Sequence, residues 1–196
     1  MSLDRTLGFI ELLNQYREVE RTILVKDKDV TENDAEHSYD LAMIAWYIIT
    51  SQNLDLNISK VMKYALVHDL VEIYAGDTWA YHEDLSKHTG KHDRELESAK
   101  RIQKEFPEFK DLHETIQMYE SRLDAESKFI YALDKLEPVM KIYLDKGRNW
   151  KKHNITLEKL KENKTQKIAS DPTVQAMYQD LLKFLEAGER ELFPEN

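Results

Sequence analysis

Four ionisable side chains follow one another closely at the end of an otherwise apolar stretch, Val61 to Asp77. They are His68, Asp69, Glu72 and Asp77. Burying such groups costs free energy unless each is paired or bound to a metal. On a helix, His68 and Glu72 are four positions apart and Asp69 and Glu72 three apart, so all three can face one point. The spacing predicts a metal site beside a proton-transfer carboxylate, and a core histidine satisfied by a carboxylate is the alternative.

A second His-Asp pair, His92-Asp93, shows how weak the dipeptide is alone. Its neighbours include Lys91, Arg94 and Glu95, so a solvated helix face is the better interpretation there. The pair at His68-Asp69 instead follows Ala65-Leu-Val, where burial is hard to escape.

Two further residues extend the possible metal site. His37 lies on the apolar face of one predicted helix, and Asp134 lies beside Leu133 on the core side of another. Together with His68 and Asp69 they offer two imidazoles and two carboxylates. That mixed donor set suits one divalent metal ion, such as Mn, Co, Fe, Ni, Zn or Mg.

Such a metal lowers the pKa of a bound water until it becomes a nucleophile near neutral pH. A carboxylate outside the coordination sphere then moves protons. Glu72 is the obvious candidate for that role, with Asp77 as a second acid or a water-orienting group.

The elements that must position these residues are helices, because no stretch shows sustained period-2 alternation. A capping box at Asn33 and Glu36 starts the helix that carries His37. The helix from about Ser59 to Gly76 is apolar around nearly its whole circumference, which predicts the central, most buried helix. Polar connectors are expected over 22–31 and 78–87. The predicted helices span 6–19, 33–52, 59–76, 91–106, 108–119, 125–146, 156–168 and 172–187.

Length and composition predict a single all-α domain over 1–196, with helices 156–187 packed on a core of about 7–145. The chain has no cysteine, which excludes thiolate metal sites. Its net charge of −9 argues against nucleic-acid binding, while a small phosphorylated substrate remains compatible with it. No signal peptide or membrane span is evident, so a soluble cytoplasmic protein is expected, with no membrane partner.

The combination of His37, His68-Asp69 and Asp134, in this order and helical placement, resembles the HD-domain metal-dependent phosphohydrolases. The segments 31–38, 65–77 and 126–134 are similar to the branch that contains the 5′-deoxynucleotidases, and the resemblance covers about 7–145. It implies an all-helical HD fold in which those four residues ligate one divalent metal and Glu72 and Asp77 do acid–base work. It also implies a homodimer, and a substrate phosphate bound by Arg21.

The resemblance therefore implies hydrolysis of nucleoside 5′-monophosphates, most often deoxyribonucleotides, to nucleoside and phosphate. The alternatives are an HD-type hydrolase of another phosphorylated metabolite, such as a nucleoside triphosphate or a phosphodiester, and a non-enzymatic metal- or ligand-binding sensor. A sensor would not need both Glu72 and Asp77, which favours the enzyme.

Each of three features allows two interpretations. Arg21 either binds phosphate or complements the dipole at the end of the first helix. Trp79, in a loop that departs from the family pattern, either stacks on a base or covers the core. A basic run is better explained as a solvated helix face than as an anion surface; its members are Lys146, Arg148, Lys151, Lys152, Lys159, Lys161, Lys164 and Lys167.

Overall fold

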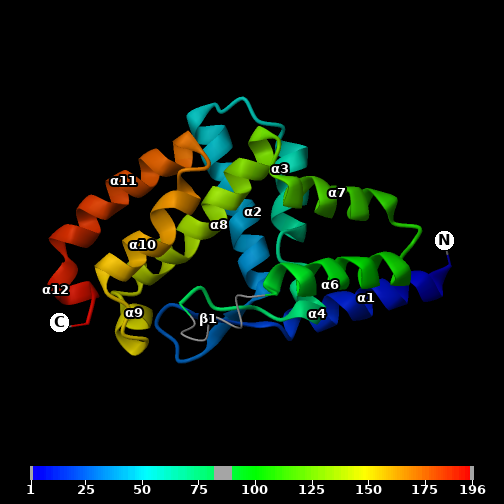
Figure 1. Ribbon diagram of the computed structural model, residues 1–196, viewed down its shortest axis with the longest axis horizontal. Coiled ribbons are helices and arrows are strands. Elements are labelled where there is room, and N and C mark those ends of the chain that lie inside the picture. Colours follow the sequence, from blue (N-terminus) through cyan, green and yellow to red (C-terminus); the bar gives the residue numbers. More distant parts are fainter. Residues whose placement is uncertain (1, 82–89, 195–196) are drawn as a thin grey trace.

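The computed structural model describes residues 2–81 and 90–194, and helices make up nearly all of its regular structure (Figure 1). The all-α fold class predicted from the sequence is confirmed, apart from one small antiparallel pair of strands. The strands are β1 (Glu20–Leu24) and β2 (Thr31–Asn33). The helices are α1 (Leu3–Arg17), α2 (Asp34–Gln52), α3 (Ile58–Val67), α4 (Glu72–Ala75), α6 (Lys91–Glu105), α7 (Lys110–Ser121), α8 (Ala125–Leu144), α9 (Arg148–Lys152), α10 (Leu157–Ile168), α11 (Pro172–Ala187) and α12 (Glu189–Leu192).

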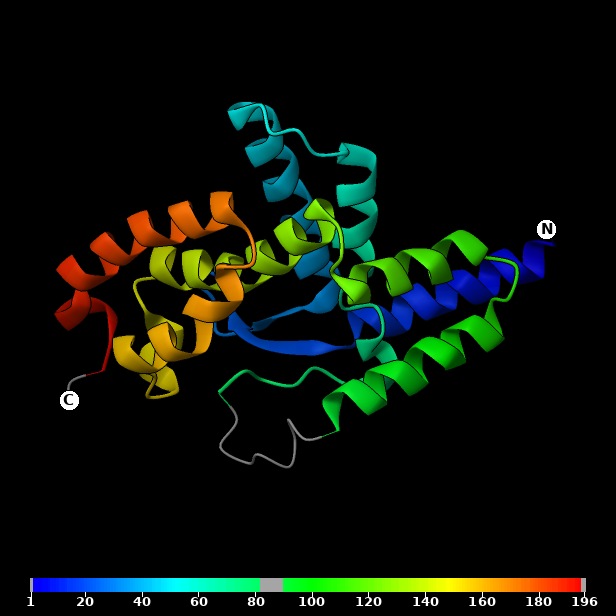
Figure 2. The same ribbon diagram turned by 45° about the horizontal axis from the view of Figure 1, so that its top comes forward.

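Helix α8 is the centre of the larger core. Helices α2 and α3 pack against α8. Helices α10 and α11, which lie toward the C-terminus in the sequence, also pack against it (Figures 1 and 2). Its residues Phe129, Ile130 and Leu133 are fully buried. The prediction that the helix starting near Ser59 is the most buried one is therefore wrong. That helix, α3, packs against α2, α7 and α8 but still leaves Leu66 54% exposed.

Helix α3 also ends nine residues earlier than the predicted Gly76, at Val67. The backbone then tightens into turns, with Leu70 N donating to Val67 O at 3.1 Å and Glu72 N donating to Asp69 O at 2.8 Å. A separate short helix, α4, starts at Glu72. His68 and Glu72 thus do not share one continuous helix, and the turn, rather than helical periodicity, sets their relative directions.

The predicted connector over 22–31 proves to be part of a hairpin. Strand β1 pairs antiparallel with β2, and Asp27 adopts a positive φ of 60° between them. The strands are too short to show an alternating pattern in the sequence. After β2, the capping box that starts α2 is confirmed, since the Asn33 side chain accepts from Glu36 N and the Glu36 side chain accepts from Asn33 N.

A second, smaller core joins α1, α6 and α7. Helix α1 contributes Leu12 and Tyr16 to it, whereas Leu7 and Ile10 are about half exposed. Helix α6 carries the exposed His92-Asp93 pair, as the charged surroundings predicted. Across the described residues, none of the helices has the length and apolar character that crossing a membrane requires. Of the connector expected over 78–87, residues 82–87 lie outside the described residues.

Candidate active site

Four side chains from three helices and one turn meet at the centre of the molecule. His37 comes from α2, His68 from the end of α3, Asp69 from the turn that follows and Asp134 from α8. One ligand atom from each lies within 4.8 Å of the others, a spacing that a single metal ion can bridge. The structure therefore brings together all four residues that the sequence selected as metal ligands, and their role stays a prediction.

The ring of His68 is oriented by its own helix. Its Nδ1 lies 2.9 Å from the carbonyl oxygen of Ala65, so Nδ1 carries the proton and donates. Its Nε2 is buried, has no hydrogen-bond partner among the described residues, and lies 3.1 Å from Asp69 Oδ2. A buried imidazole nitrogen with a free lone pair, beside carboxylate oxygens, fits a metal ligand.

His37 is held by carboxylates on both sides. Its Nε2 lies 3.2 Å from Asp134 Oδ1, and its Nδ1 lies 3.3 Å from Oε2 of the fully buried Glu137. Burial and Arg21 lower the pKa of His37, but Glu137 and Asp134 outweigh them and raise it to about 9. The surroundings thus stabilise positive charge at this point, as a cation site requires.

Glu137 was missed by sequence reasoning. It lies one turn after Asp134 on the buried face of α8, and an acidic residue at that spacing was the available signal. Lys141 binds both Glu137, at 2.6 Å, and Glu32 of β2, at 2.6 Å. This outer layer fixes the carboxylate that faces His37.

Arg21 lies on β1, so its interpretation as a cation at the end of α1 is wrong. Its Nη1 donates to Asp69 Oδ2 at 2.7 Å and to Asp34 Oδ1 at 2.9 Å, and its Nε lies 3.3 Å from Glu32 Oε1. Asp34 was also missed, because it reads as a first-turn acid of α2. Burial, then Asp69, raise the pKa of Asp34 to about 7 despite Arg21.

The two predicted acid–base residues lie next to the cluster. Glu72 is buried, and its Oε1 accepts from Lys91 at 3.0 Å, whereas its Oε2 is buried without a hydrogen-bond partner among the described residues. Burial and the charge of Asp69 raise the pKa of Glu72 well above its ordinary value. Asp77 follows Gly76, whose φ of 75° turns the chain after α4, and lines the same pocket.

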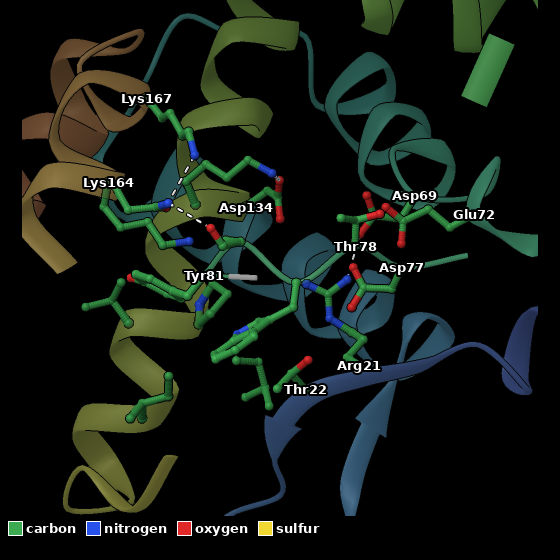
Figure 3. Close-up of a pocket in the computed structure, with 18 of the residues that line it drawn as sticks. Arg21, Thr22, Asp69, Glu72, Asp77, Thr78, Tyr81, Asp134, Lys164 and Lys167 are labelled. Atoms are coloured by element: carbon green, nitrogen blue, oxygen red, sulfur yellow. Dashed lines mark hydrogen bonds and ion pairs between the residues drawn. The ribbon is translucent and has the colours of Figure 1, made fainter. Parts of the chain in front are cut away.

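A pocket of about 420 Å³ opens beside the cluster, within the usual size of a small-molecule site. Figure 3 shows Arg21, Asp69, Glu72 and Asp77 on one side of it and two lysines of α10 on the other. Its apolar lining is made by side chains of several elements: Ile23, Trp79, Tyr81, Pro138, Val139, Ile142 and Trp150.

Trp79 packs against the core as one of its two interpretations predicted, and its stacking on a base stays a prediction. Its ring lies 4.7 Å from that of His153 and 5.7 Å from that of Tyr81, packed against the larger core, and it also lines the pocket. The lysines of the basic run also differ in their exposure. Lys151 and Lys159 are exposed as predicted, but Lys164 is buried at the pocket, so the solvated-face interpretation is wrong for this residue.

Comparisons with known proteins agree with this arrangement. A sequence model of the HD domain family matches residues 13–177. The chain is similar to 5′-deoxynucleotidase HDDC2 of Homo sapiens, at 34% identity over 68% of this chain and 65% of the relative, and to that of Mus musculus, at 33% identity over 68% and 66%. The alignments thus span slightly less than two thirds of these relatives' own length.

Solved structures show the same fold. A crystal structure of a predicted metal-dependent phosphohydrolase from Magnetospirillum magnetotacticum superimposes with a TM-score of 0.82 and 28% identity, covering 98% of this chain and 96% of that one. A conserved hypothetical protein from Pyrococcus furiosus, at 18% identity, shares the fold with a TM-score of 0.64 over 92% of this chain and 99% of its own.

Proposed function

Because the chain belongs to the HD domain family, we propose that it is a metal-dependent phosphomonoesterase acting on nucleoside 5′-monophosphates, in particular deoxyribonucleotides. One observation carries the proposal. The unpartnered Nε2 of His68 points into a cluster with His37, Asp69 and Asp134, and the cluster adjoins a pocket of mononucleotide size. Relatives named 5′-deoxynucleotidase support the substrate class.

His37, His68, Asp69 and Asp134 would hold one divalent metal ion. When bound, the ion supplies Lewis-acid polarisation of the phosphate and a water of lowered pKa. Burial opposes the charge of Asp69, whereas Arg21, whose Nη1 donates to Asp69 Oδ2 at 2.7 Å, stabilises it and lowers the pKa of Asp69.

The remaining work falls to side chains of the pocket. The leaving 5′ oxygen needs a proton as its bond to phosphorus breaks, and Glu72 is the carboxyl group whose surroundings favour its protonated form. Asp77, on the same side of the pocket, orients the attacking water or acts as a second acid. Trp79 offers a face on which the base can stack. Most of the rate enhancement then comes from positioning and charge stabilisation.

A phosphate-release screen tests the proposal. Purified protein is assayed with nucleoside 5′-monophosphates, triphosphates and diesters in Mn, Co, Mg and Zn, with His68→Ala as control. Metal-stimulated release from deoxyribonucleoside monophosphates supports it. Release only from triphosphates or diesters would favour the other HD-type hydrolases. No release from any nucleotide would favour a sensor, and turnover that survives Asp69→Ala would refute the mechanism.

We also propose that the chain forms a homodimer in the cytoplasm. Helix α2 supports the first part, because its outer face exposes an apolar stripe of Tyr39, Met43, Trp46 and Tyr47. Sedimentation equilibrium tests it. The expected mass is twice that of the chain and falls to one chain in Trp46→Glu, while a monomeric wild type would refute the dimer. Fluorescence imaging of the tagged protein tests the location.

A further inference from the structure

Cationic side chains gather around the pocket, and all but one of them have acceptors within the described residues. The set is Arg21, Lys91, Lys135, Lys164 and Lys167. Arg21, Lys91 and Lys135 each pair with at least one carboxylate, and Lys167 Nζ donates to Asn163 Oδ1 at 3.3 Å. Lys164 makes no hydrogen bond or ion pair with any residue that the structure describes. Its ammonium group is therefore the free cation of this pocket among the described side chains.

Burying the ammonium group of Lys164 at this position costs free energy. Its side chain is 8% exposed, and it lies midway between the fully buried Leu160 and Ile168 on one face of α10. Burial, and after it the charge of Lys135, lower the pKa of Lys164 to about 7. An apolar residue at this place would pack without that penalty. A lysine here is explained by a ligand that supplies the missing negative charge.

Helix α10 is fastened to the pocket wall beside this lysine. Asn163 Nδ2 donates to the carbonyl oxygen of Ala80 at 3.0 Å, which joins α10 to the loop that follows Asp77. In Figure 3 Lys164 reaches into the pocket from the side opposite Arg21, and Asp134 lies between the two. Both Lys164 and Asp134 line this pocket, so an anion bound in it can reach Lys164.

Arg21, on the other side of the pocket, differs from Lys164 in already having partners. Its guanidinium faces Asp34, Asp69 and Glu32. Lys164 has no such carboxylate among the described residues, so it is the cation of this pocket that lacks a counter-charge.

We propose that Lys164 binds the phosphate of the substrate. This inference rests on the proposed phosphomonoesterase function. The phosphate oxygens provide the acceptors that the buried ammonium group lacks, and charge-assisted hydrogen bonds of this kind are the strong ones.

Inorganic phosphate, a product of the proposed reaction, is the probe. Its dissociation constant is measured calorimetrically on metal-loaded protein, together with kcat and KM for a deoxyribonucleoside monophosphate. In Lys164→Met we expect phosphate to bind about 10- to 100-fold more weakly and KM to rise by a similar factor, because a hydrogen bond to a charged group is lost. Lys164→Arg keeps the charge and should recover part of the affinity. Lys159→Met, on the exposed side of α10, is the matched control and should change neither constant.

The outcomes separate the inference from the function on which it rests. Wild-type phosphate affinity and KM in Lys164→Met, in an active enzyme, would overturn the inference and leave the function standing. A wild type that binds phosphate through Lys164 but releases none from any nucleotide would refute the function and keep the anion site. A wild type that does not bind phosphate would also overturn the inference. Lys164→Gln replaces the methionine variant if that variant melts below the wild type.

Discussion

The Nδ1 atom of His68 donates to the carbonyl oxygen of Ala65, 2.9 Å away, in the last turn of α3. This bond determines which ring nitrogen faces the cluster, because the proton on Nδ1 leaves the lone pair on Nε2. The end of a helix is a suitable place for it, since the last carbonyl groups have no intrahelical donor. One backbone acceptor thus leaves the Nε2 lone pair free for the metal ion that we propose.

His68→Gln should purify with little bound metal and should lose more than about 100-fold in metal affinity, which exceeds the usual effect of an outer partner. Metal content by mass spectrometry of the purified protein measures this. His92→Gln, from the exposed His-Asp pair on α6, is the control and should bind metal as the wild type does. Equal metal content in the two variants would remove His68 from the ligand set.

Glu137→Gln should weaken metal binding by about 10- to 100-fold, because Glu137 holds the Nδ1 side of His37 at 3.3 Å. Competition with a chelating dye measures the dissociation constant. Asp40→Asn removes another partner of Lys141 that is itself 44% exposed, and should have little effect. If both variants bind metal equally well, Glu137 does not orient His37.

Glu72→Gln should lower kcat by about 10²- to 10⁴-fold, the usual contribution of a general acid or base, while the metal content stays at the wild-type level. Steady-state kinetics and metal analysis on the same preparation separate these effects. Glu95→Gln is matched to it, because Glu95 is the other carboxylate bound by Lys91, at 3.2 Å. An unchanged kcat in Glu72→Gln would exclude this residue from proton transfer.

Asp124 should make stability depend on pH. It caps α8 by accepting from Ser127 N at 2.7 Å, and it also binds Lys60 and Tyr64. Burial opposes its charge, but Lys60 and the other donors outweigh it and lower the pKa of Asp124 to about 2. Because the folded-state pKa is below the unfolded value of about 3.9, its ionised form stabilises the fold above about pH 4. That contribution is lost as the pH falls toward about 2.

Urea unfolding of the wild type and of Asp124→Asn from pH 7 to pH 3 measures this contribution. The asparagine retains a capping oxygen, so the difference in the free energy of unfolding should be about 0.5–1 kcal/mol at pH 7 and should shrink below about pH 4. Asp124→Ala loses the cap too and should cost about 1 kcal/mol more. Asp180→Asn, at an exposed ion pair, serves as the control. A difference that does not change with pH would contradict the assigned pKa.

The part of the fold that rests on strong periodicity could be predicted from sequence. Helix α8 was expected over 125–146 and spans Ala125–Leu144, and the helix expected over 172–187 is α11, Pro172–Ala187. The break after Val67 could not be predicted, because Leu70, Val71 and Ile73 continue an apolar pattern through it. Tertiary packing, with Leu70 and Val71 buried in the smaller core, ends the helix there. That residues 1–196 form one domain stays a prediction.

The candidate site, too, could be predicted from the sequence only in part. The four proposed ligands were recognisable because each places a titratable group on an apolar face. Glu137, Asp34 and Lys164 were not, since their roles depend on which side chain faces them across the fold. Lys164 in particular sits in a run of lysines whose other members include exposed residues, and only the contact between α10 and the loop at Ala80 distinguishes it.

The pocket draws on both ends of the chain, with Arg21 on β1 and Lys164 on α10. During synthesis, which proceeds from the N-terminus, the ribosome will have produced all four proposed ligands once Asp134 is made, while α10 is still missing. The four proposed ligands are therefore made before the part of the pocket that α10 contributes. A chain that ends after α8 would thus carry the four proposed ligands but lack Lys164.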